Sequence, residues 1–164
     1  FASPAVAKPP EPFTGVVVAV SDGDTYTVKR SDASTVRVRL HYADAPEVAH
    51  NRREVDQPHG RESQAFASRR LLGKSADVRP VGESYDRIVA DVTTDQGDDM
   101  AKALEQAGLA MLDKRFKPPA SLVEAENKAK QNKRGVWADE SPLPPWEWRK
   151  QYREQRIMPR LLVQ

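Results

Sequence analysis

The sequence predicts one α+β domain, in which five short strands and three helices form a small β-barrel with helices around it. Alternating or β-branched segments separated by turn residues indicate the strands. Segments with helical periodicity, bounded by capping residues, glycine or proline, indicate the helices. The chain has 164 residues, of which 38% are hydrophobic, and this is enough for one hydrophobic core.

The first three strands follow a proline-rich segment. Residues 1–12 contain four prolines and are expected to form an extended leader. Residues 16–20 are a β-branched run that reads as a buried strand, and an Asp-Gly turn leads from it to a second strand over residues 25–29. Residues 35–42 alternate between apolar and polar side chains, so the three strands should form an antiparallel meander.

The remaining elements follow a long loop, which we expect over residues 48–61 because no periodicity is visible there. Helices are predicted over residues 61–72, over residues 100–107 and between Pro118 and Gly135, and strands over residues 76–80 and 88–92. Pro80 should confine its strand to a sheet edge. The order β-β-β-α-β-β-α-α fits an OB-fold-like barrel. Periodicity by itself indicates only the α+β class, and closure of the barrel is inferred from the order.

The domain is therefore expected to span residues 13–137, with residues 138–164 as a C-terminal extension. Three prolines open this extension, and a short Trp- and Arg-rich helix is predicted over residues 146–153. Two interpretations of the extension stay open. Its tryptophans pack on the domain, or its aromatic and basic side chains extend a groove for nucleic acid.

The composition excludes several kinds of site. There is no cysteine, so thiol catalysis, disulfides and Cys-type zinc sites are absent. A net charge of +2 is too small to indicate a polyanionic partner by itself. No apolar run approaches the length of a membrane span, so we expect no membrane partner. We also expect a monomer. The chain begins with Phe1 and not with Met, which is explained either by removal of a signal peptide or by the boundary of a fragment. We favour the first explanation and expect a secreted or periplasmic protein.

Carboxylates from two separate turns form the candidate metal site. Asp24 lies where a turn meets a strand, and Asp44 lies at the end of the next alternating strand. Hard cations such as Ca²⁺ prefer several oxygen ligands, which include carboxylates and backbone carbonyls. Pro46 restrains Ala45 to an extended backbone, so the carbonyl of Ala45 is a further candidate ligand. Asp22 either supports this turn or is a turn residue only.

The candidate catalytic residues are Glu47 and two arginines. A carboxylate beside a metal ion, such as that of Glu47, can orient or deprotonate a water molecule. The guanidinium groups of Arg39 and Arg87 match the oxygens of a phosphate with two parallel hydrogen bonds. Taken singly, Glu47 reads as a loop residue and each arginine as a surface strand residue. Their occurrence together with the two aspartates favours a phosphodiesterase site.

One difficulty concerns the direction of the side chains. Arg39 and Asp44 are an odd number of residues apart, so strict alternation would place them on opposite faces of a strand. Both can serve one site only if the strand twists, bulges or ends between them. We predict this break near Tyr42 and Ala43.

Several segments together resemble the staphylococcal nuclease family over about residues 14–137. They are residues 18–28, 39–47, 85–92, 107–110 and 124–137. The resemblance implies an OB-fold barrel and calcium-dependent hydrolysis of DNA and RNA with little sequence specificity, leaving 3′-phosphate ends. The Pro-Pro-Trp-Glu-Trp-Arg segment is similar to the ending of bacterial members.

The resemblance also implies roles for individual residues. The metal ligands would be Asp24, Asp44 and the carbonyl of Ala45; Glu47 would contact the attacking water; Arg39 and Arg87 would bind the scissile phosphate; and Tyr85 would flank the nucleotide. Lys114 and Phe116 stand where the type enzyme has two tyrosines, so stacking on Phe116 survives but phenolic hydrogen bonds do not. Ala45 replaces a threonine, Asp86 a glycine and Ser84 a phosphate-binding lysine.

Two alternatives remain at this stage. The first is a catalytically silent OB-type module that binds nucleic acid or a protein, although such modules typically lose the acids or arginines that are present here. The second is a nuclease that works with Mg²⁺ or Mn²⁺, because oxygen ligands alone do not select Ca²⁺.

Overall fold

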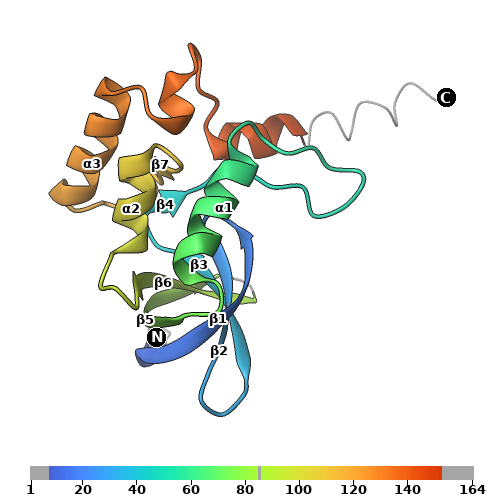
Figure 1. The fold of residues 1–164 in the computed structure, drawn as a ribbon, viewed down its shortest axis with the longest axis vertical. Helices are drawn as coiled ribbons and strands as arrows, with labels where there is room; N and C mark the ends of the chain where they lie inside the picture. Colours follow the sequence, from blue (N-terminus) through green and yellow to red (C-terminus); the bar gives the residue numbers. More distant parts are fainter. Residues whose placement is uncertain (1–7, 85, 153–164) are drawn as a thin grey trace, which may run out of the picture.

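Five strands form a closed barrel in the order β1-β2-β3-β6-β5 (Figure 1). They are β1 (Phe13–Asp22), β2 (Thr25–Lys29), β3 (Thr35–Leu40), β5 (Ser75–Ser84) and β6 (Arg87–Thr94). The structure is a computed structural model and describes residues 8–84 and 86–152. The barrel closes because β5 pairs with both β1 and β6, while β3 pairs with β6 in parallel. The predicted α+β class, the OB-like barrel and the antiparallel meander of β1, β2 and β3 are confirmed.

Alternating side chains from these strands fill the barrel. Val17, Val28 and Val38 are fully buried, whereas Val16 and Val18 are 43% and 45% exposed. The valine run of β1 is therefore buried at alternate positions only, because successive side chains of a strand point to opposite faces. The prediction that this run is buried throughout was wrong. β1 also extends beyond the predicted residues at both ends.

Among the described residues of the domain, three α-helices and one short 3-10 helix accompany the barrel, which is one helix more than predicted (Figure 1). The α-helices are α1 (Gly60–Leu71), α2 (Met100–Ala107) and α3 (Ala120–Gln131). α1 and α2 pack against the barrel, and α3 packs against α2. α2 has the predicted bounds, because Asp99 accepts a hydrogen bond from the backbone N–H of Lys102 and Gly108 adopts a left-handed conformation after the last turn.

The third helix ends earlier than predicted. α3 stops at Gln131, and Lys133 has a positive φ of 49° that takes the chain out of the helix. Gly135 begins a 3-10 helix, η1 (Gly135–Ala138), instead of ending α3. The N–H of Val136 donates to the carbonyl of Gly108 at 2.9 Å, which fixes η1 against the end of α2.

Two further features differ from the prediction. β5 continues well past Pro80, which lies beyond the part of β5 that pairs with β1 and beside a register shift against β6. A proline is tolerated there because this part of β5 donates no hydrogen bond to β1. A two-stranded sheet of β4 (Ala43–Asp44) and β7 (Met111–Leu112) was not predicted, since two-residue strands leave no periodic signal.

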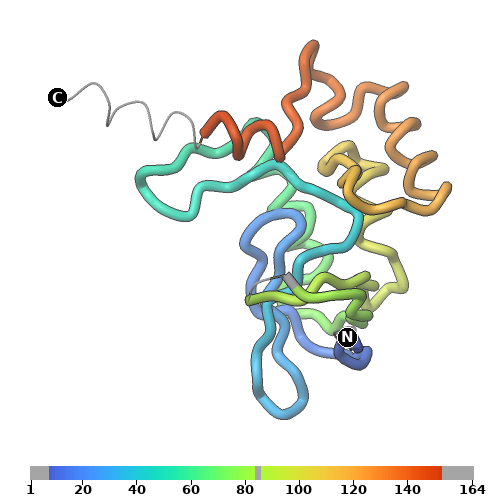
Figure 2. The backbone as a smooth tube through the Cα atoms, turned by 180° about the vertical axis from the view of Figure 1, so that it is seen from behind, coloured from blue at the N-terminus to red at the C-terminus, as the bar shows by residue number. Residues whose placement is uncertain are grey.

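The C-terminal extension lies beside the long loop of residues 48–59, as both views show (Figures 1 and 2). Residues 145–152 are helical in the described part of the chain. The side chain of Gln57 donates to the carbonyl of Leu143 at 2.7 Å, and the hydroxyl of Tyr152 donates to the carbonyl of Arg53. His59 also contacts Asp139, at 3.1 Å. Among the described helices, none has the length and apolar character needed to cross a membrane.

Candidate active site

Acidic and basic side chains line a cavity of about 680 Å³ at one end of the barrel. The charged residues that line it are Asp22, Asp24, Arg39, Glu47, Glu83, Arg87, Asp113, Arg115 and Arg149. They come from the β1–β2 turn, the end of β3, the loop after β4, the end of β5, the start of β6, the segment after β7 and the C-terminal helix. Most of the residues selected from the sequence therefore meet at one place.

Asp24 is the best-connected acid of this cavity. Its carboxylate accepts hydrogen bonds from the backbone N–H of Ala45 at 2.7 Å and from the hydroxyl of Thr25 at 2.9 Å, and it forms an ion pair with Arg39. Burial disfavours its charge, but Arg39 and these hydrogen bonds outweigh burial and lower the pKa of Asp24. Asp24 is thus ionised and held in one orientation.

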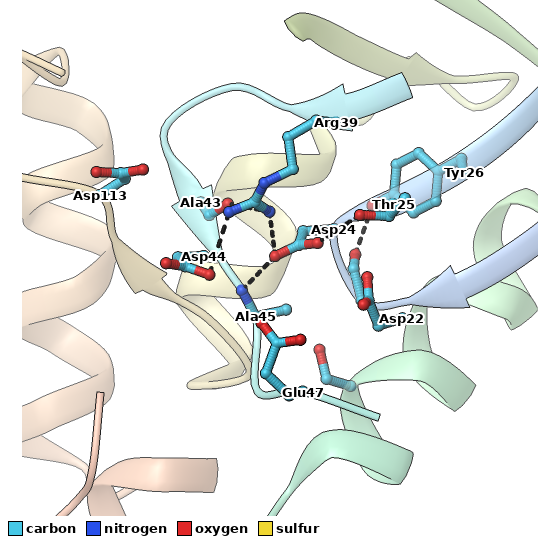
Figure 3. Close-up of polar contacts among 12 residues, drawn as sticks. Asp22, Asp24, Thr25, Tyr26, Arg39, Ala43, Asp44, Ala45, Glu47 and Asp113 are labelled. Atoms are coloured by element: carbon cyan, nitrogen blue, oxygen red, sulfur yellow. Dashed lines mark hydrogen bonds and ion pairs between the residues drawn. The ribbon is translucent and has the colours of Figure 1, made fainter. Parts of the chain in front are cut away.

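Arg39 lies between Asp24 and Asp44 (Figure 3). Its Nη2 is 3.1 Å from an oxygen of Asp44, and its Nη1 donates to the carbonyl of Ala43 at 3.2 Å. Burial opposes the charge of Arg39, but the two aspartates outweigh this effect and raise its pKa. One guanidinium therefore contacts both carboxylates, which brings Asp24 and Asp44 to the same side chain.

The predicted break between Arg39 and Asp44 is confirmed. β3 ends at Leu40, Tyr42 has a positive φ of 67°, and β4 begins at Ala43. The carbonyl of Tyr42 accepts a hydrogen bond from the N–H of Asp113 at 2.6 Å, which holds this left-handed residue in place. The change of direction brings the side chains of Arg39 and Asp44 to the same space.

Asp22 is the acid in the least favourable surroundings. It is buried, and its Oδ1 has no hydrogen-bond partner among the described residues. Burial, together with the neighbouring charge of Asp24, raises the pKa of Asp22 to about 9. The pKa of Asp22 and that of Asp24 thus move in opposite directions, as expected for two close carboxyl groups. Of the two acidic groups in this turn, Asp24 pairs with an arginine and Asp22 does not, among the described residues.

Glu47 lies at the mouth of the same cavity, on the side of Asp24 that faces Asp22 (Figure 3). Burial raises the pKa of its carboxyl above the ordinary value, although hydrogen bonding to Arg149 opposes the rise. Its backbone N–H donates to the side chain of Gln57 at 3.1 Å, so the long loop fixes the position of Glu47. A carboxylate with a raised pKa is a better proton acceptor for catalysis near neutral pH.

The structure adds one residue that we did not select from the sequence. Arg149 of the C-terminal helix donates to both oxygens of Asp44, at 3.0 and 2.8 Å, and to Glu47 at 2.6 Å. The only signal in the sequence is an arginine within an aromatic and basic segment. Nothing in that segment identifies partners about 100 residues away.

Not all of the residues predicted to bind the substrate line the cavity. Arg87 and Phe116 line the cavity, and Phe116 packs edge-on against His41. Lys114 lines a neighbouring groove that Phe116 shares, and does not line the cavity itself. Tyr85 lies outside the described residues.

The carboxylate and carbonyl oxygens of this cavity are suitable ligands for a hard divalent cation, but in the part of the chain that the structure describes they are not arranged as a metal centre. Within the described residues, no three acidic or histidine side chains converge in the arrangement of a metal centre. Guanidinium groups contact these oxygens instead: Arg39 binds Asp24, and Arg149 binds both oxygens of Asp44. The partnerless oxygen of Asp22 and the surplus of carboxylates indicate a site in which a bound cation would be favourable.

Comparison with known proteins identifies the family. The profile described as "Staphylococcal nuclease homologue" matches residues 37–139. An "Uncharacterized endonuclease" of Escherichia coli is 35% identical over 136 residues, covering 82% of this chain and 84% of the relative. A similarly named protein of Haemophilus influenzae is 29% identical, covering 82% of this chain and 72% of the relative. The "Staphylococcal-like nuclease CAN1" of Arabidopsis thaliana is 32% identical over 74% of this chain, and over 35% of its own length.

These matches agree with the barrel and with the position of the cavity. The family profile covers well over half of the chain, including Arg39, Asp44, Glu47 and Arg87. The chain belongs to the staphylococcal nuclease family.

Proposed function

We propose that this nuclease hydrolyses phosphodiester bonds of DNA and RNA with little sequence specificity, in a reaction that depends on a divalent cation, with Ca²⁺ the first candidate. One observation carries the proposal: Arg39 spans Asp24 and Asp44 beside Glu47, so acids and a guanidinium meet in one cavity. The membership in the family and the printed names of its relatives support the nuclease activity.

Asp24, Asp44 and the carbonyl of Ala45 are the residues that would hold the cation. The N–H of Ala45 already binds Asp24, which fixes the backbone of this residue. When bound, the cation would supply Lewis-acid stabilisation of the charge on the phosphoryl oxygens. Mg²⁺ and Mn²⁺ have the same preference for oxygen ligands and are the alternatives.

Glu47 is the proposed proton acceptor. Water adds to phosphorus, the bond between phosphorus and the 5′ oxygen breaks, and Glu47 takes the proton that the water loses. The products are one end with a 3′-phosphate and one with a 5′-hydroxyl, whose proton comes from solvent. The raised pKa of Glu47 suits this role, because a base is most effective when its pKa approaches the working pH.

Arg39 and Arg87 are the proposed phosphate-binding residues. Arg39 remains charged in its buried position because of Asp24 and Asp44. Arg87 lines the cavity at the start of β6, and forms no salt bridge within the described part of the chain. Its donors are therefore left for a ligand. Phe116 offers a ring face for a base, and Lys114 a positive charge in the adjoining groove.

The experiment is the digestion of plasmid DNA and of RNA with Ca²⁺, Mg²⁺, Mn²⁺ or a chelator. We expect cleavage of both substrates with Ca²⁺ and none with the chelator. DNA ends should prime a polymerase only after phosphatase treatment, because a 3′-phosphate blocks extension. Full activity in the chelator would refute the dependence on a cation, and ends that extend directly would refute the proposed cleavage position.

Two variants test the residue roles. Glu47→Gln and Arg87→Gln should each lower turnover by about 10²-fold or more, by removing a proton acceptor or a charge-stabilising group. Arg70→Gln is the matched control, because Arg70 lies on α1 outside the cavity and pairs with Asp98. Near-normal rates in folded Glu47→Gln and Arg87→Gln proteins would show that the roles are wrongly assigned.

A further inference from the structure

The C-terminal helix places a positive charge on the same oxygens that the proposed cation needs. Arg149 binds Asp44 through both terminal nitrogens and binds Glu47 through one of them. The side chain of Asp44 is 1% exposed, so its oxygens have few other approaches. The guanidinium of Arg149 therefore lies where a metal ion bound to Asp44 and near Glu47 would lie.

A cation and this guanidinium would oppose each other. Calcium–oxygen distances are about 2.4 Å, and the nitrogens of Arg149 are 2.8 and 3.0 Å from the oxygens of Asp44. An ion on either oxygen would thus lie within about 5.4 Å of a guanidinium nitrogen, by addition of these distances. The two positive charges would repel each other, and the ion would compete for lone pairs that Arg149 now uses.

Arg149 is better placed to withdraw than Arg39. The side chain of Arg149 is 36% exposed, whereas that of Arg39 is 12% exposed and also bonds the carbonyl of Ala43. Arg149 belongs to a short helix that is joined to the domain through the long loop, by way of Gln57 and Tyr152. Neither of these hydrogen bonds reaches a barrel strand, so the barrel keeps its own hydrogen bonds if the helix withdraws from the cavity.

We propose that Arg149 is an internal competitor of the divalent cation and sets the cation concentration at which the nuclease works. Without the ion, Arg149 neutralises Asp44 and Glu47. Binding of the ion displaces Arg149 from Asp44 and loosens the C-terminal helix. This inference rests on the proposed dependence on a cation. Coupling between two ligands of one site is reciprocal. The docked helix therefore weakens the binding of the ion, and the bound ion weakens the docking of the helix by the same factor.

The test is calorimetric titration of the full chain with Ca²⁺, without substrate. The Arg149→Gln variant should bind Ca²⁺ about tenfold more tightly than the wild type, because partly exposed, charge-assisted hydrogen bonds no longer compete. Lys150→Gln is the matched control: it removes the same charge from the next residue, which is exposed, and should leave the affinity unchanged. Arg149→Lys keeps the charge without the fork and should fall between Arg149→Gln and the wild type.

Hydrogen exchange gives a second readout that is independent of catalysis. Ca²⁺ should accelerate amide exchange across residues 145–152 in the wild type, since it releases this helix. In Arg149→Gln the exchange should be fast with or without Ca²⁺. Equal or weaker Ca²⁺ binding by Arg149→Gln, or exchange in the wild type that Ca²⁺ slows, would overturn the competition. If no protein bound Ca²⁺ and cleavage continued in a chelator, the proposed function itself would fail, which separates the two failures.

Discussion

Replacing Glu105 with glutamine should stabilise the protein, and increasingly so as the pH rises. Glu105 lies on α2 and is 0% exposed, and neither oxygen of its carboxyl group has a hydrogen-bond partner among the described residues. Burial, followed by repulsion from Glu126, raises the pKa of Glu105 well above its ordinary value, although Lys130 opposes the rise. The folded protein therefore holds this carboxyl group in its neutral form.

The pH range of the effect follows from the two states of the chain. In the unfolded chain Glu105 loses its proton near pH 4.5, whereas in the folded protein it keeps the proton to higher pH. Below pH 4.5 both states are protonated and the group adds no pH dependence. Above that value the unfolded state binds fewer protons, so the free energy of unfolding falls by up to about 1.4 kcal/mol per pH unit until the folded-state pKa is reached.

The gain in the free energy of unfolding depends on how strongly burial opposes the charged form of Glu105. An unsatisfied buried polar group costs about 1–3 kcal/mol, and more when it is charged. Glutamine has nearly the same shape and does not ionise, so Glu105→Gln should match the wild type at pH 4. At higher pH it should be the more stable protein, by up to about 1.4 kcal/mol for each pH unit between 4.5 and the folded-state pKa of Glu105. In a chain of this length each kcal/mol corresponds to a rise of about 2–4 °C in Tm.

Chemical denaturation at pH 4, 6 and 8 measures the difference. Glu124→Gln on α3 is the matched control, because Glu124 is exposed and pairs with Lys128 at 2.8 Å. This pair lowers the pKa of Glu124, so its removal should change stability only slightly and in the opposite direction. A difference between Glu105→Gln and the wild type that is constant with pH would refute the reasoning, because Glu105 would then ionise alike in both states.

Two further predictions concern the backbone and a histidine. Gly108→Ala should cost more than about 2 kcal/mol in a denaturant titration, because Gly108 has a φ of +68° and an added Cβ would lie 2.1 Å from the carbonyl oxygen of Arg134. Gly73→Ala, at a φ of +75° with nothing within 4 Å, should cost only about 1 kcal/mol, and equal losses would contradict the proposed clash. His59→Gln should destabilise the protein below pH 6.5, by less than about 1 kcal/mol, because its two carboxylate partners outweigh burial and raise the pKa of His59 from 6.5. The difference should vanish as the pH passes the folded-state pKa, and a loss that persists at pH 9 would contradict this origin.

The centre of the site could be predicted because its residues lie within two short stretches of sequence. Asp24 follows a turn between paired strands, and Arg39, Asp44 and Glu47 lie within nine residues. Local spacing limits how far apart such residues can lie once strands are assigned. The odd separation of Arg39 and Asp44 even required a break in the strand, which the left-handed Tyr42 supplies.

Other features could not be predicted, because their causes are not local. Pro80 favoured a short strand, yet β5 runs on because only β6 pairs with that part. Gly135 was taken as the end of α3, but its positive φ serves the close approach of η1 to Gly108. β4 and β7 depend on a pairing across nearly 70 residues and have no pattern of their own.

The charge balance of the site could not be predicted from the sequence, because Arg149 lies about 100 residues from its partners. Asp24, Asp44 and Glu47 carry three negative charges when ionised, whereas the sequence led us to expect two positive charges near them, Arg39 and Arg87. A buried surplus of this kind costs free energy unless something neutralises it. Asp22 lies beside these acids, and one of its oxygens has no hydrogen-bond partner among the described residues. In the structure Arg149 supplies a further positive charge. If a metal ion takes over that role during catalysis, Arg149 must be repelled from Asp44. The proposed competition is therefore an exchange of positive charges at Asp44, and the C-terminal helix carries one of them.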